Sequence, residues 1–465
     1  MIDVVDHLGT VRPQIGAPLA ARFQPPSLIP HSRYMLGQTV DYSNRVQAAF
    51  AEQIASDGPQ NFAKFMEASL FSGRDGYYTG GNVQIGEEIG ADHFPTAATA
   101  SPVFGAFIGT AVARLWRSMG CPENFQVVEM GPGEGHLAKS TLEFLKASEI
   151  KLYETMKYRL VERSPALLER QRARLCAFSN VEFTEDSALN FKTAPIDGIF
   201  ISNELPDAFA IERVTLVDGK PLMAYLTIEN CQWIEEWRPL TPEIATFIRR
   251  FGIELKEGSE TPISTSSAEW MNNVCTNLGR GGVLSIDYGS YNYISSPGDE
   301  CIKVYGTKDK TTKLDKRVVP LAIRDAGKID MTAGVSFRVL EDVAEECGLR
   351  TSFLGNAQGF YLKLGPASVF NSLCSCYEPR DADLNSVEEF KRQYIWRSFN
   401  RNFGTDMCLF STKGVKLASN FWEAGDNLVP KIDRHPVDVL RSVDKLRSKP
   451  ALARYIESVG FWPGY

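Results

Sequence analysis

The pattern of apolar and polar residues predicts two kinds of region in this chain. Residues 41–72 carry apolar side chains at helical spacing, broken at Asp57-Gly58-Pro59, and residues 103–118 do so again. After residue 121, short apolar runs of strand length alternate with helical segments. Because strands that alternate with helices form parallel βαβ units, we expect an α/β fold with a mostly parallel twisted sheet and helices on both faces. The strand-like runs are 125–130, 158–161, 181–183, 196–202 and 281–287.

The remaining stretches suggest how the chain is divided. Residues 1–36 are rich in proline, which fixes backbone angles and removes hydrogen-bond donors, so we expect an extended arm. A polar, Trp-containing stretch at about 215–265 interrupts the strand–helix alternation, and we interpret it as a lid inserted over the sheet edge. The expected parts are the arm 1–36, an N-terminal helical region 37–120, a Rossmann-like domain 121–365 that includes the lid, and a helical C-terminal extension 366–465.

Composition narrows the class of protein. The 465 residues include 50 Lys+Arg and 57 Asp+Glu, a formal net charge of −7, which argues against a nucleic-acid partner because phosphate contacts need a basic face. No apolar run reaches the ~18 residues of a membrane span. The N-terminal residues show neither the apolar block of a secretory signal nor an Arg-rich presequence, so we expect a cytoplasmic protein. The nine cysteines have no zinc-ligand spacing, which predicts reduced thiols and no metal site.

The strongest local signal is a glycine turn between a strand and a helix, Glu129-Met-Gly131-Pro-Gly133-Glu-Gly135-His136. Glycines let the backbone turn sharply, and a helix that begins at His136 points free N–H groups at a ligand. A nucleotide-containing cofactor is therefore expected at this strand end, with His136 beside it. The carboxylate of Glu129 would attract the amino group of S-adenosylmethionine and repel a pyrophosphate, so we expect S-adenosylmethionine.

Later strand ends add candidate cofactor-binding residues. Glu162 ends the second strand and can accept hydrogen bonds from both ribose hydroxyls. Asp186 and Ser187 follow the third strand, where an adenine-binding acid falls in this type of fold, and Asn203 ends the fourth. The alternative is a tight turn without a ligand. Two acids at consecutive strand ends favour the cofactor site.

These motifs occur in an order that resembles the MidA-like S-adenosylmethionine-dependent methyltransferases, whose mitochondrial members methylate an arginine of a respiratory complex I subunit. The resemblance covers about residues 60–365 and implies a class I methyltransferase fold with an added helical region. The matching segments are 62–70 with 76–78, 101–105, 128–135, 160–168, 202–208, 281–289, 330–333 and 358–359.

The chain departs from the family pattern near the expected acceptor. His93 and Thr99 stand where the family has acids, Gly334 and Ser336 stand where it often has His and Asp, and Glu134 replaces a loop arginine. We interpret these changes as the loss of an acidic site edge. A guanidinium, with a pKa above about 12, needs carboxylates, whereas a carboxylic acid is already an anion at pH 7. We therefore expect a carboxyl O-methyltransferase that forms methyl esters of small organic acids in secondary metabolism.

The candidate catalytic residues leave alternatives open. Glu204 and Asp207 follow the fourth strand and would bind a cation. Alternatively, Glu204 or Asn203 only shapes the cofactor pocket and Asp207 only caps a helix. His93 would act as a general base, as a donor to an anionic acceptor, or only structurally. The alternative functions are a protein arginine N-methyltransferase or respiratory complex assembly factor, and a scaffold without cofactor. A homodimer is a further open expectation.

Overall fold

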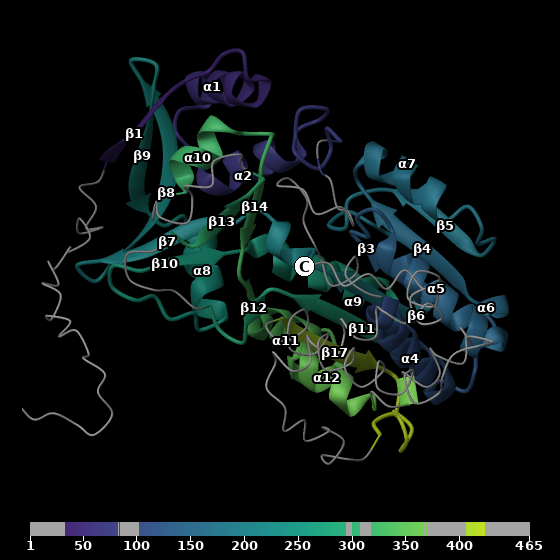
Figure 1. Cartoon of the computed structure of the whole chain (residues 1–465). Coiled ribbons are helices and arrows are strands. Elements are labelled where there is room, and N and C mark those ends of the chain that lie inside the picture. Colours follow the sequence, from purple (N-terminus) through teal and green to yellow (C-terminus); the bar gives the residue numbers. More distant parts are fainter. Residues whose placement is uncertain are drawn as a thin grey trace, which may run out of the picture.

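A computed structural model describes residues 33–81, 83, 102–293, 300–306, 318–365, 368–369 and 406–423. Two main sheets organise these residues. One has seven strands in the order β16-β17-β11-β6-β3-β4-β5, and the other has six, with the path β1-β9-β8-β7-β10 and β2 paired to β8. Figure 1 shows the strands of the second sheet together with α1, α2 and α10 on one side of the molecule, and β3 to β6 on the other.

The seven-stranded sheet is the Rossmann-like sheet that the sequence predicts. Strands β3 to β6 and β11 are parallel, and β17 is antiparallel to both β11 and β16. Because β4 and β5 extend from β3 in one direction while β6 and β11 extend in the other, the order switches between β3 and β6, where ligands bind in such sheets. The strands are β3 (Gln126–Met130), β4 (Lys157–Glu162), β5 (Val181–Glu185), β6 (Ile196–Asn203), β11 (Leu278–Asp287), β16 (Arg350–Asn356) and β17 (Met407–Lys413).

Helices cover both faces of this sheet, because its central strands are apolar on both sides. Val127 and Ile201 pack into one buried cluster with α4, α5, α6 and α12, whereas Val128 and Phe200 pack into another with α8, α9 and α11. The expected α/β class I fold is therefore confirmed. The helices are α4 (Pro102–Ser118), α5 (His136–Ser148), α6 (Ile150–Thr155), α7 (Pro165–Arg174), α8 (Pro242–Arg250), α9 (Thr265–Asn277), α11 (Phe337–Glu346) and α12 (Ala357–Lys363).

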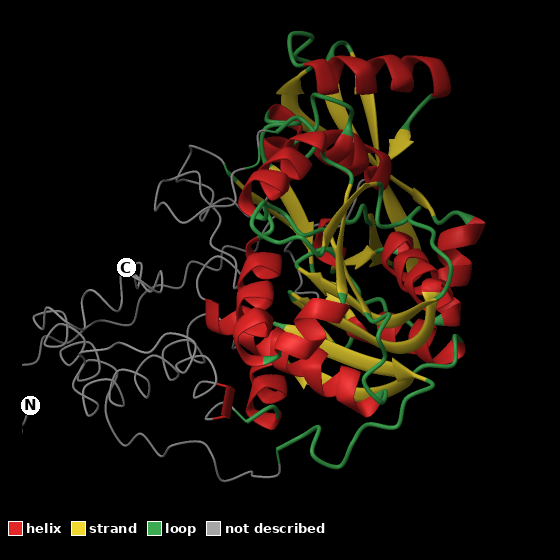
Figure 2. Ribbon diagram, turned by 90° about the vertical axis from the view of Figure 1, so that its right-hand side faces the viewer, coloured by secondary structure: helices red, strands yellow, loops and turns green. Residues whose placement is uncertain are grey.

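The second sheet combines an N-terminal segment with the stretch that we interpreted as a lid. Strands β7 to β10 pair in one antiparallel sheet with β1, and Phe65, Trp233 and Met331 belong to its separate buried cluster. Figure 2 shows this sheet and its helices above the seven-stranded one. Its elements are β1 (Arg33–Thr39), α1 (Arg45–Asp57), β2 (Gln60–Asn61), α2 (Phe62–Phe71), β7 (Glu212–Val217), β8 (Lys220–Glu229), β9 (Gln232–Pro239), β10 (Glu260–Ile263) and α10 (Val319–Arg324).

Short elements lie between the two sheets. Strands β13 and β14 are antiparallel, with Lys303 opposite Thr332 and Tyr305 opposite Asp330, so these four side chains share one face of the pair. The short elements are η1 (Pro206–Ala208), β12 (Gly289–Ser290), β13 (Ile302–Tyr305), β14 (Asp330–Ala333) and β15 (Val335–Ser336).

The structure adds two strands that the sequence did not reveal. Residues 33–36, placed at the end of the extended arm, belong to strand β1, where only Leu36 is buried and the apolar signal is weak. Residues 407–413, placed in a helical extension, form strand β17, because a short apolar run buried on both faces cannot be told from a helix by periodicity. Across the described ranges, none of the helices has the length and apolar character needed to cross a bilayer.

Candidate active site

The three glycines of the turn after β3 adopt left-handed backbone angles. The φ values of Gly131, Gly133 and Gly135 are 64°, 54° and 81°, a region that residues with a side chain rarely occupy. A Cβ on Gly131 would lie 2.7 Å from Leu205 Cδ1. Gly135 precedes α5, so the free N–H groups of this helix face the carboxyl ends of the neighbouring strands.

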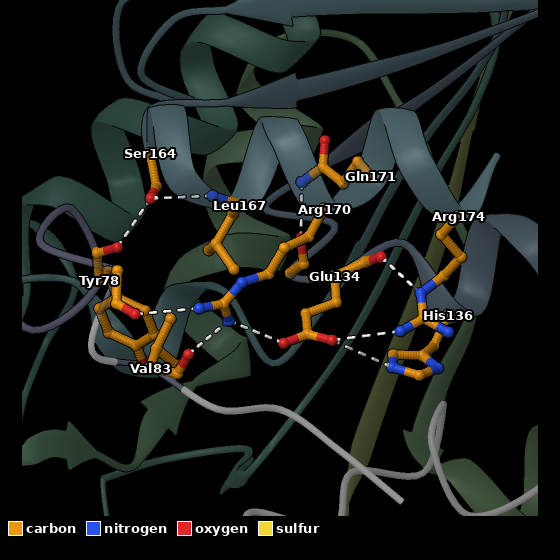
Figure 3. A network of polar contacts seen from close by, with 11 residues as sticks. Tyr78, Val83, Glu134, His136, Ser164, Leu167, Arg170, Gln171 and Arg174 are labelled. Atoms are coloured by element: carbon orange, nitrogen blue, oxygen red, sulfur yellow. Dashed lines mark hydrogen bonds and ion pairs between the residues drawn. The ribbon is translucent and has the colours of Figure 1, made fainter. Parts of the chain in front are cut away.

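Helix α7 holds the glycine turn in place through three side chains (Figure 3). Gln171 Nε2 donates to the Gly133 carbonyl at 2.6 Å, and Arg174 Nε donates to the Glu134 carbonyl at 2.9 Å. The guanidinium groups of Arg170 and Arg174 also bind the Glu134 carboxylate, at 2.9 and 3.2 Å. Burial would raise the pKa of Glu134, but His136 and Arg170 outweigh it and lower this pKa to about 2. The turn is therefore preorganised by charge.

The carboxylate of Glu162 lies at the next strand end, only 6% exposed. Its Oε1 accepts a hydrogen bond of 2.8 Å from the Ser164 backbone N–H. Burial raises the pKa of Glu162 to about 7, against backbone donors that lower it. The Asp186 N–H donates to the Glu162 carbonyl at 3.1 Å, and Asp186 Oδ1 accepts from the Ser187 N–H at 2.8 Å. The structure thus brings Glu162, Asp186 and Ser187 together.

Three buried polar atoms near these strand ends have no hydrogen-bond partner among the described residues. They are Asn203 Oδ1 at the end of β6, Gln171 Oε1 on α7 and His136 Nε2 on α5. His136 Nε2 does face the Glu134 carboxylate, at 3.7 Å from Oε2, so only the Asn203 and Gln171 oxygens lack any polar contact of this kind. Because buried polar atoms are normally paired, these two oxygens beside a glycine turn indicate a polar ligand.

Glu129 lies deeper than its predicted role requires. Its side chain is 2% exposed and accepts a hydrogen bond of 2.5 Å from the Tyr158 hydroxyl. Burial raises the pKa of Glu129 to about 8, although the Tyr158 bond acts in the other direction. Its negative charge at neutral pH is therefore smaller than the sequence argument assumed, and its contact with a ligand amino group stays a prediction.

The predicted acceptor side of the site begins directly after β6. Glu204 has a φ of 51°, and its N–H donates to the Ile286 carbonyl of β11 at 3.0 Å. A non-glycine residue in this region costs about 1 kcal/mol or more, and such strain is concentrated at functional sites. The Glu204 carboxylate accepts a hydrogen bond of 3.3 Å from Asn203 Nδ2, which joins the two predicted sites.

Three aspartates converge beside Glu204. Asp207 Oδ2 accepts a hydrogen bond of 2.8 Å from the Thr332 hydroxyl, and the Asp207 N–H donates to Asp287 Oδ2 at 3.2 Å. Asp330 accepts a hydrogen bond of 2.8 Å from the hydroxyl of Tyr78. Asp287 ends β11 and Asp330 begins β14, so segments far apart in the sequence supply one cluster of acids.

The electrostatics show that these acids act on one another. Burial raises the pKa of Asp207 to about 6, and burial followed by the charge of Asp207 raises the pKa of Asp330 to about 7. Burial, Asp207 and Glu204 raise the pKa of Asp287 well above its ordinary value. Closely spaced carboxylates cannot all ionise cheaply, so the cluster would gain from a bound cation.

Two aromatic residues and a lysine border these acids on the exposed side. Tyr288 is 37% exposed and Tyr305 is 38% exposed, and the Lys303 ammonium lies 3.8 Å from the centre of the Tyr288 ring. Burial first, and then charges that include Asp207 and Asp330, raise the pKa of Tyr305. Partly exposed aromatic rings therefore lie beside the buried acids.

The structure brings together acids that the sequence interpretation kept apart. The loss of acids was inferred at His93, Thr99, Gly334 and Ser336, whereas Glu204, Asp207, Asp287 and Asp330 form a separate acidic cluster. Asp287 and Asp330 lay inside recognised motifs, but nothing local in the sequence marked them as neighbours of Asp207. His93 falls outside the described residues. Within the described ranges, no group of His, Cys, Asp and Glu side chains is arranged to hold a metal ion.

Fold and site together define a class I S-adenosylmethionine-dependent methyltransferase. A family model described as "Putative S-adenosyl-L-methionine-dependent methyltransferase" matches residues 107–354. The chain belongs to this family, and both the family resemblance and S-adenosylmethionine as cofactor are confirmed.

Similar proteins agree with this assignment. The chain is 25% identical to a protein named protein arginine methyltransferase NDUFAF7 homolog, mitochondrial, from Drosophila melanogaster, over 72% of this chain and 78% of that protein. It is 27% identical to protein arginine methyltransferase NDUFAF7, mitochondrial, from Danio rerio, over 71% and 78%. Among solved structures, it resembles a Burkholderia thailandensis protein bound to S-adenosyl-homocysteine, with a TM-score of 0.66 and 23% identity, over 80% of this chain and 93% of that one.

The residues at the strand ends fit S-adenosylmethionine. The unpaired atoms Asn203 Oδ1 and Gln171 Oε1 need polar partners, and the Glu162 carboxylate suits ribose hydroxyls. When bound, the cofactor supplies an electrophilic methyl group on a sulfonium. The roles of Gly131, Gly133, Gly135, Asp186 and Ser187 in holding it stay predictions.

Proposed function

We propose that this protein transfers the methyl group to the guanidinium of an arginine side chain in a protein. The observation that carries the proposal is the cluster of Glu204, Asp207, Asp287 and Asp330 at the ends of β6 and β11 and on β14. Such a cluster suits a cation whose pKa exceeds about 12, since ionised carboxylates bind it without having to deprotonate it. The relatives named as protein arginine methyltransferases support the same acceptor.

The acids have two tasks in this reaction. The first is to bind and orient the planar guanidinium, for which paired carboxylate oxygens are well shaped. The second is to accept a proton, because an N–C bond forms as the S–CH₃ bond breaks and the methylated nitrogen must lose one hydrogen. Asp207 and Asp330, with pKa values of about 6 and about 7, are suited to that proton transfer near neutral pH.

The carboxyl O-methyltransferase that we expected from the sequence is not supported by this arrangement. A small organic acid would enter as an anion beside Glu204 and three aspartates, and like charges repel at short range. The Lys303 ammonium, on the same face of the β13–β14 pair as Asp330, lies over the Tyr288 ring. The arginine acceptor, which was the alternative, is therefore the better proposal.

The test is a methylation assay on the purified chain with labelled S-adenosylmethionine. We expect label on arginine-containing peptides and none when the same arginine is replaced by lysine or glutamine. A panel of small mono- and dicarboxylic acids is run in parallel. Methyl esters from that panel, with unlabelled peptides, would refute the proposal.

Matched variants connect the activity to the acids. We expect Asp330→Asn to lower kcat/KM for the peptide at least about 10-fold, or ~1.4 kcal/mol, with little change in cofactor affinity. Glu254→Gln removes an exposed acid on the loop after α8 and serves as the control. Equal activity of the two variants would contradict the assignment of the acceptor site.

A further inference from the structure

The segment Tyr77–Gly81, with Val83, lies between the cofactor side and the acceptor side of the site. Its start is fixed by backbone hydrogen bonds to α2, from the Tyr77 N–H to Ser69 at 3.0 Å and from the Tyr78 N–H to Leu70 at 2.9 Å. The Tyr78 ring stacks on Phe71, with 5.4 Å between ring centres. The position of the Tyr78 ring is therefore set by packing and does not depend on its hydroxyl.

The cofactor side reaches this segment at two points (Figure 3). The Ser164 hydroxyl donates to the Tyr78 carbonyl at 2.7 Å, while the Ser164 N–H donates to the Glu162 carboxylate at 2.8 Å. Ser164 thus contacts both Glu162, which is predicted to bind the ribose, and Tyr78. A movement of Glu162 would therefore displace Tyr78, and a movement of Tyr78 would displace Glu162.

The second point is Arg170 on α7. Its guanidinium donates to the Val83 carbonyl at 2.6 Å and to the Gly81 carbonyl at 3.0 Å, and it binds the Glu134 carboxylate of the glycine turn at 2.9 Å. One planar cation therefore joins the segment to the turn that approaches the cofactor.

The acceptor side reaches the same segment through one hydrogen bond. The Tyr78 hydroxyl donates to Asp330 Oδ1 at 2.8 Å, and this bond lowers a pKa that burial and Asp207 raise. The Tyr78 hydroxyl therefore influences how much of the Asp330 carboxylate is ionised near neutral pH.

We propose that Tyr78 is a positioning residue that orients Asp330 and favours its ionised form for the acceptor. Ser164 and Arg170 connect the segment that contains Tyr78 to the cofactor side, so that cofactor and acceptor bind with positive cooperativity. This inference rests on the proposed arginine acceptor. It extends that function with a named residue and a coupling between the two sites. Because Ser164 and Arg170 join the segment to the cofactor side and Tyr78 joins it to Asp330, a ligand that shifts the contacts at one site changes those at the other.

Tyr78→Phe tests the effect on Asp330. The substitution keeps the ring, its stacking and both backbone contacts, and removes only the hydroxyl. Since the lost bond lowers the pKa of Asp330, that pKa rises, and we expect the pH profile of kcat/KM for the arginine peptide to move upward by about half to one pH unit. The affinity for S-adenosylhomocysteine without peptide should change less than about 2-fold.

Arg170→Ala tests the coupling, with Arg174→Ala as the matched control. Both arginines bind Glu134, but only Arg170 also contacts Gly81 and Val83. Peptide affinity is measured by calorimetry with and without saturating S-adenosylhomocysteine. We expect the cofactor product to tighten peptide binding about 5-fold or more in the wild type and in Arg174→Ala, and less than about 2-fold in Arg170→Ala.

Each outcome separates the two proposals. Wild-type protein that labels no arginine peptide refutes the proposed function, and the present inference fails with it. If wild-type protein does label arginine, an unshifted pH profile in Tyr78→Phe, or equal coupling in the two arginine variants, refutes the inference alone. Thermal unfolding of each variant confirms that it is folded before these measurements.

Discussion

Buried carboxyl groups dominate this site at the scale of single residues. Glu162 and Asp330 both have pKa values of about 7, for the same first reason, which is burial. Each is held by donors that favour its ionised form, and for each we propose a contact with a group of a ligand. The sequence located Glu162, because it ends a recognisable strand, but it did not locate Asp330, whose neighbours come from three separate segments.

A substitution at Glu162 tests the cofactor side. Glu162→Gln removes the anion while keeping the shape, and we expect S-adenosylmethionine to bind about 10-fold more weakly or worse, because a charged acceptor is lost for the ribose hydroxyls. Calorimetric titration measures the affinity. Glu182→Gln on β5 is the control, since Glu182 pairs with Lys157 and Arg159 away from the turn, and an equal loss there would contradict the assignment.

A substitution at Gly131 tests the glycine turn. Gly131→Ala places a Cβ 2.7 Å from Leu205 Cδ1, so we expect weaker cofactor binding in addition to lower stability. Gly219→Ala, in the turn between β7 and β8, has a similar positive φ but no atom within 4 Å of the added Cβ. It should cost about 1 kcal/mol of stability and leave cofactor affinity unchanged. Unaltered affinity in Gly131→Ala would argue against a close ligand approach.

At the scale of elements, the sequence predicted the strands that follow one another in βαβ units. Strands β3, β4, β6 and β11 coincide with apolar runs, because both sides of each are buried between helices. The sheet of β7 to β10 was interpreted only as a polar insertion, because it pairs with β1, which lies far away near the N-terminus, and no local pattern reveals such a partner. Strand β17 was missed because a short apolar run that is buried on both faces cannot be told from a helix by periodicity.

A core substitution in β17 measures how much this strand contributes to the stability of the main sheet. Phe410 is fully buried and packs against Phe360 and Phe421. We expect Phe410→Ala to lower the free energy of unfolding by about 3–5 kcal/mol. Tyr42→Ala removes an aromatic residue that is 61% exposed and should change it by less than about 0.5 kcal/mol. Chemical denaturation compares the two, and equal effects would place β17 outside the cooperative core.

At the scale of the whole molecule, burying so many acids makes stability depend on pH. The folded-state pKa values of Glu129, Glu162, Glu212 and Asp330 are raised to about 8, 7, 7 and 7, mainly by burial. In the unfolded chain these groups titrate near pH 4. The folded protein therefore binds more protons than the unfolded one between those values.

We accordingly expect the free energy of unfolding to fall as the pH rises from about 5 to about 8. A carboxyl group whose pKa is raised by folding stabilises the folded state below its unfolded-state pKa. This stabilisation is lost as the pH rises through the folded-state pKa of the group. Thermal unfolding of the ligand-free protein across this range measures the slope. Glu129→Gln should flatten it near pH 8, and a melting temperature that rises steadily with pH would contradict the prediction.

The pairing of β1 with β9 has a consequence for synthesis. Arg33 and its partner Glu236 are 203 positions apart, so the first strand leaves the ribosome long before the strand that completes its sheet. At about 5–20 residues per second, it waits on the order of 10–40 s without its neighbour. During that interval the nascent N-terminal strand is open to wrong pairing, so slow elongation through the middle of the message should lower the yield of folded protein.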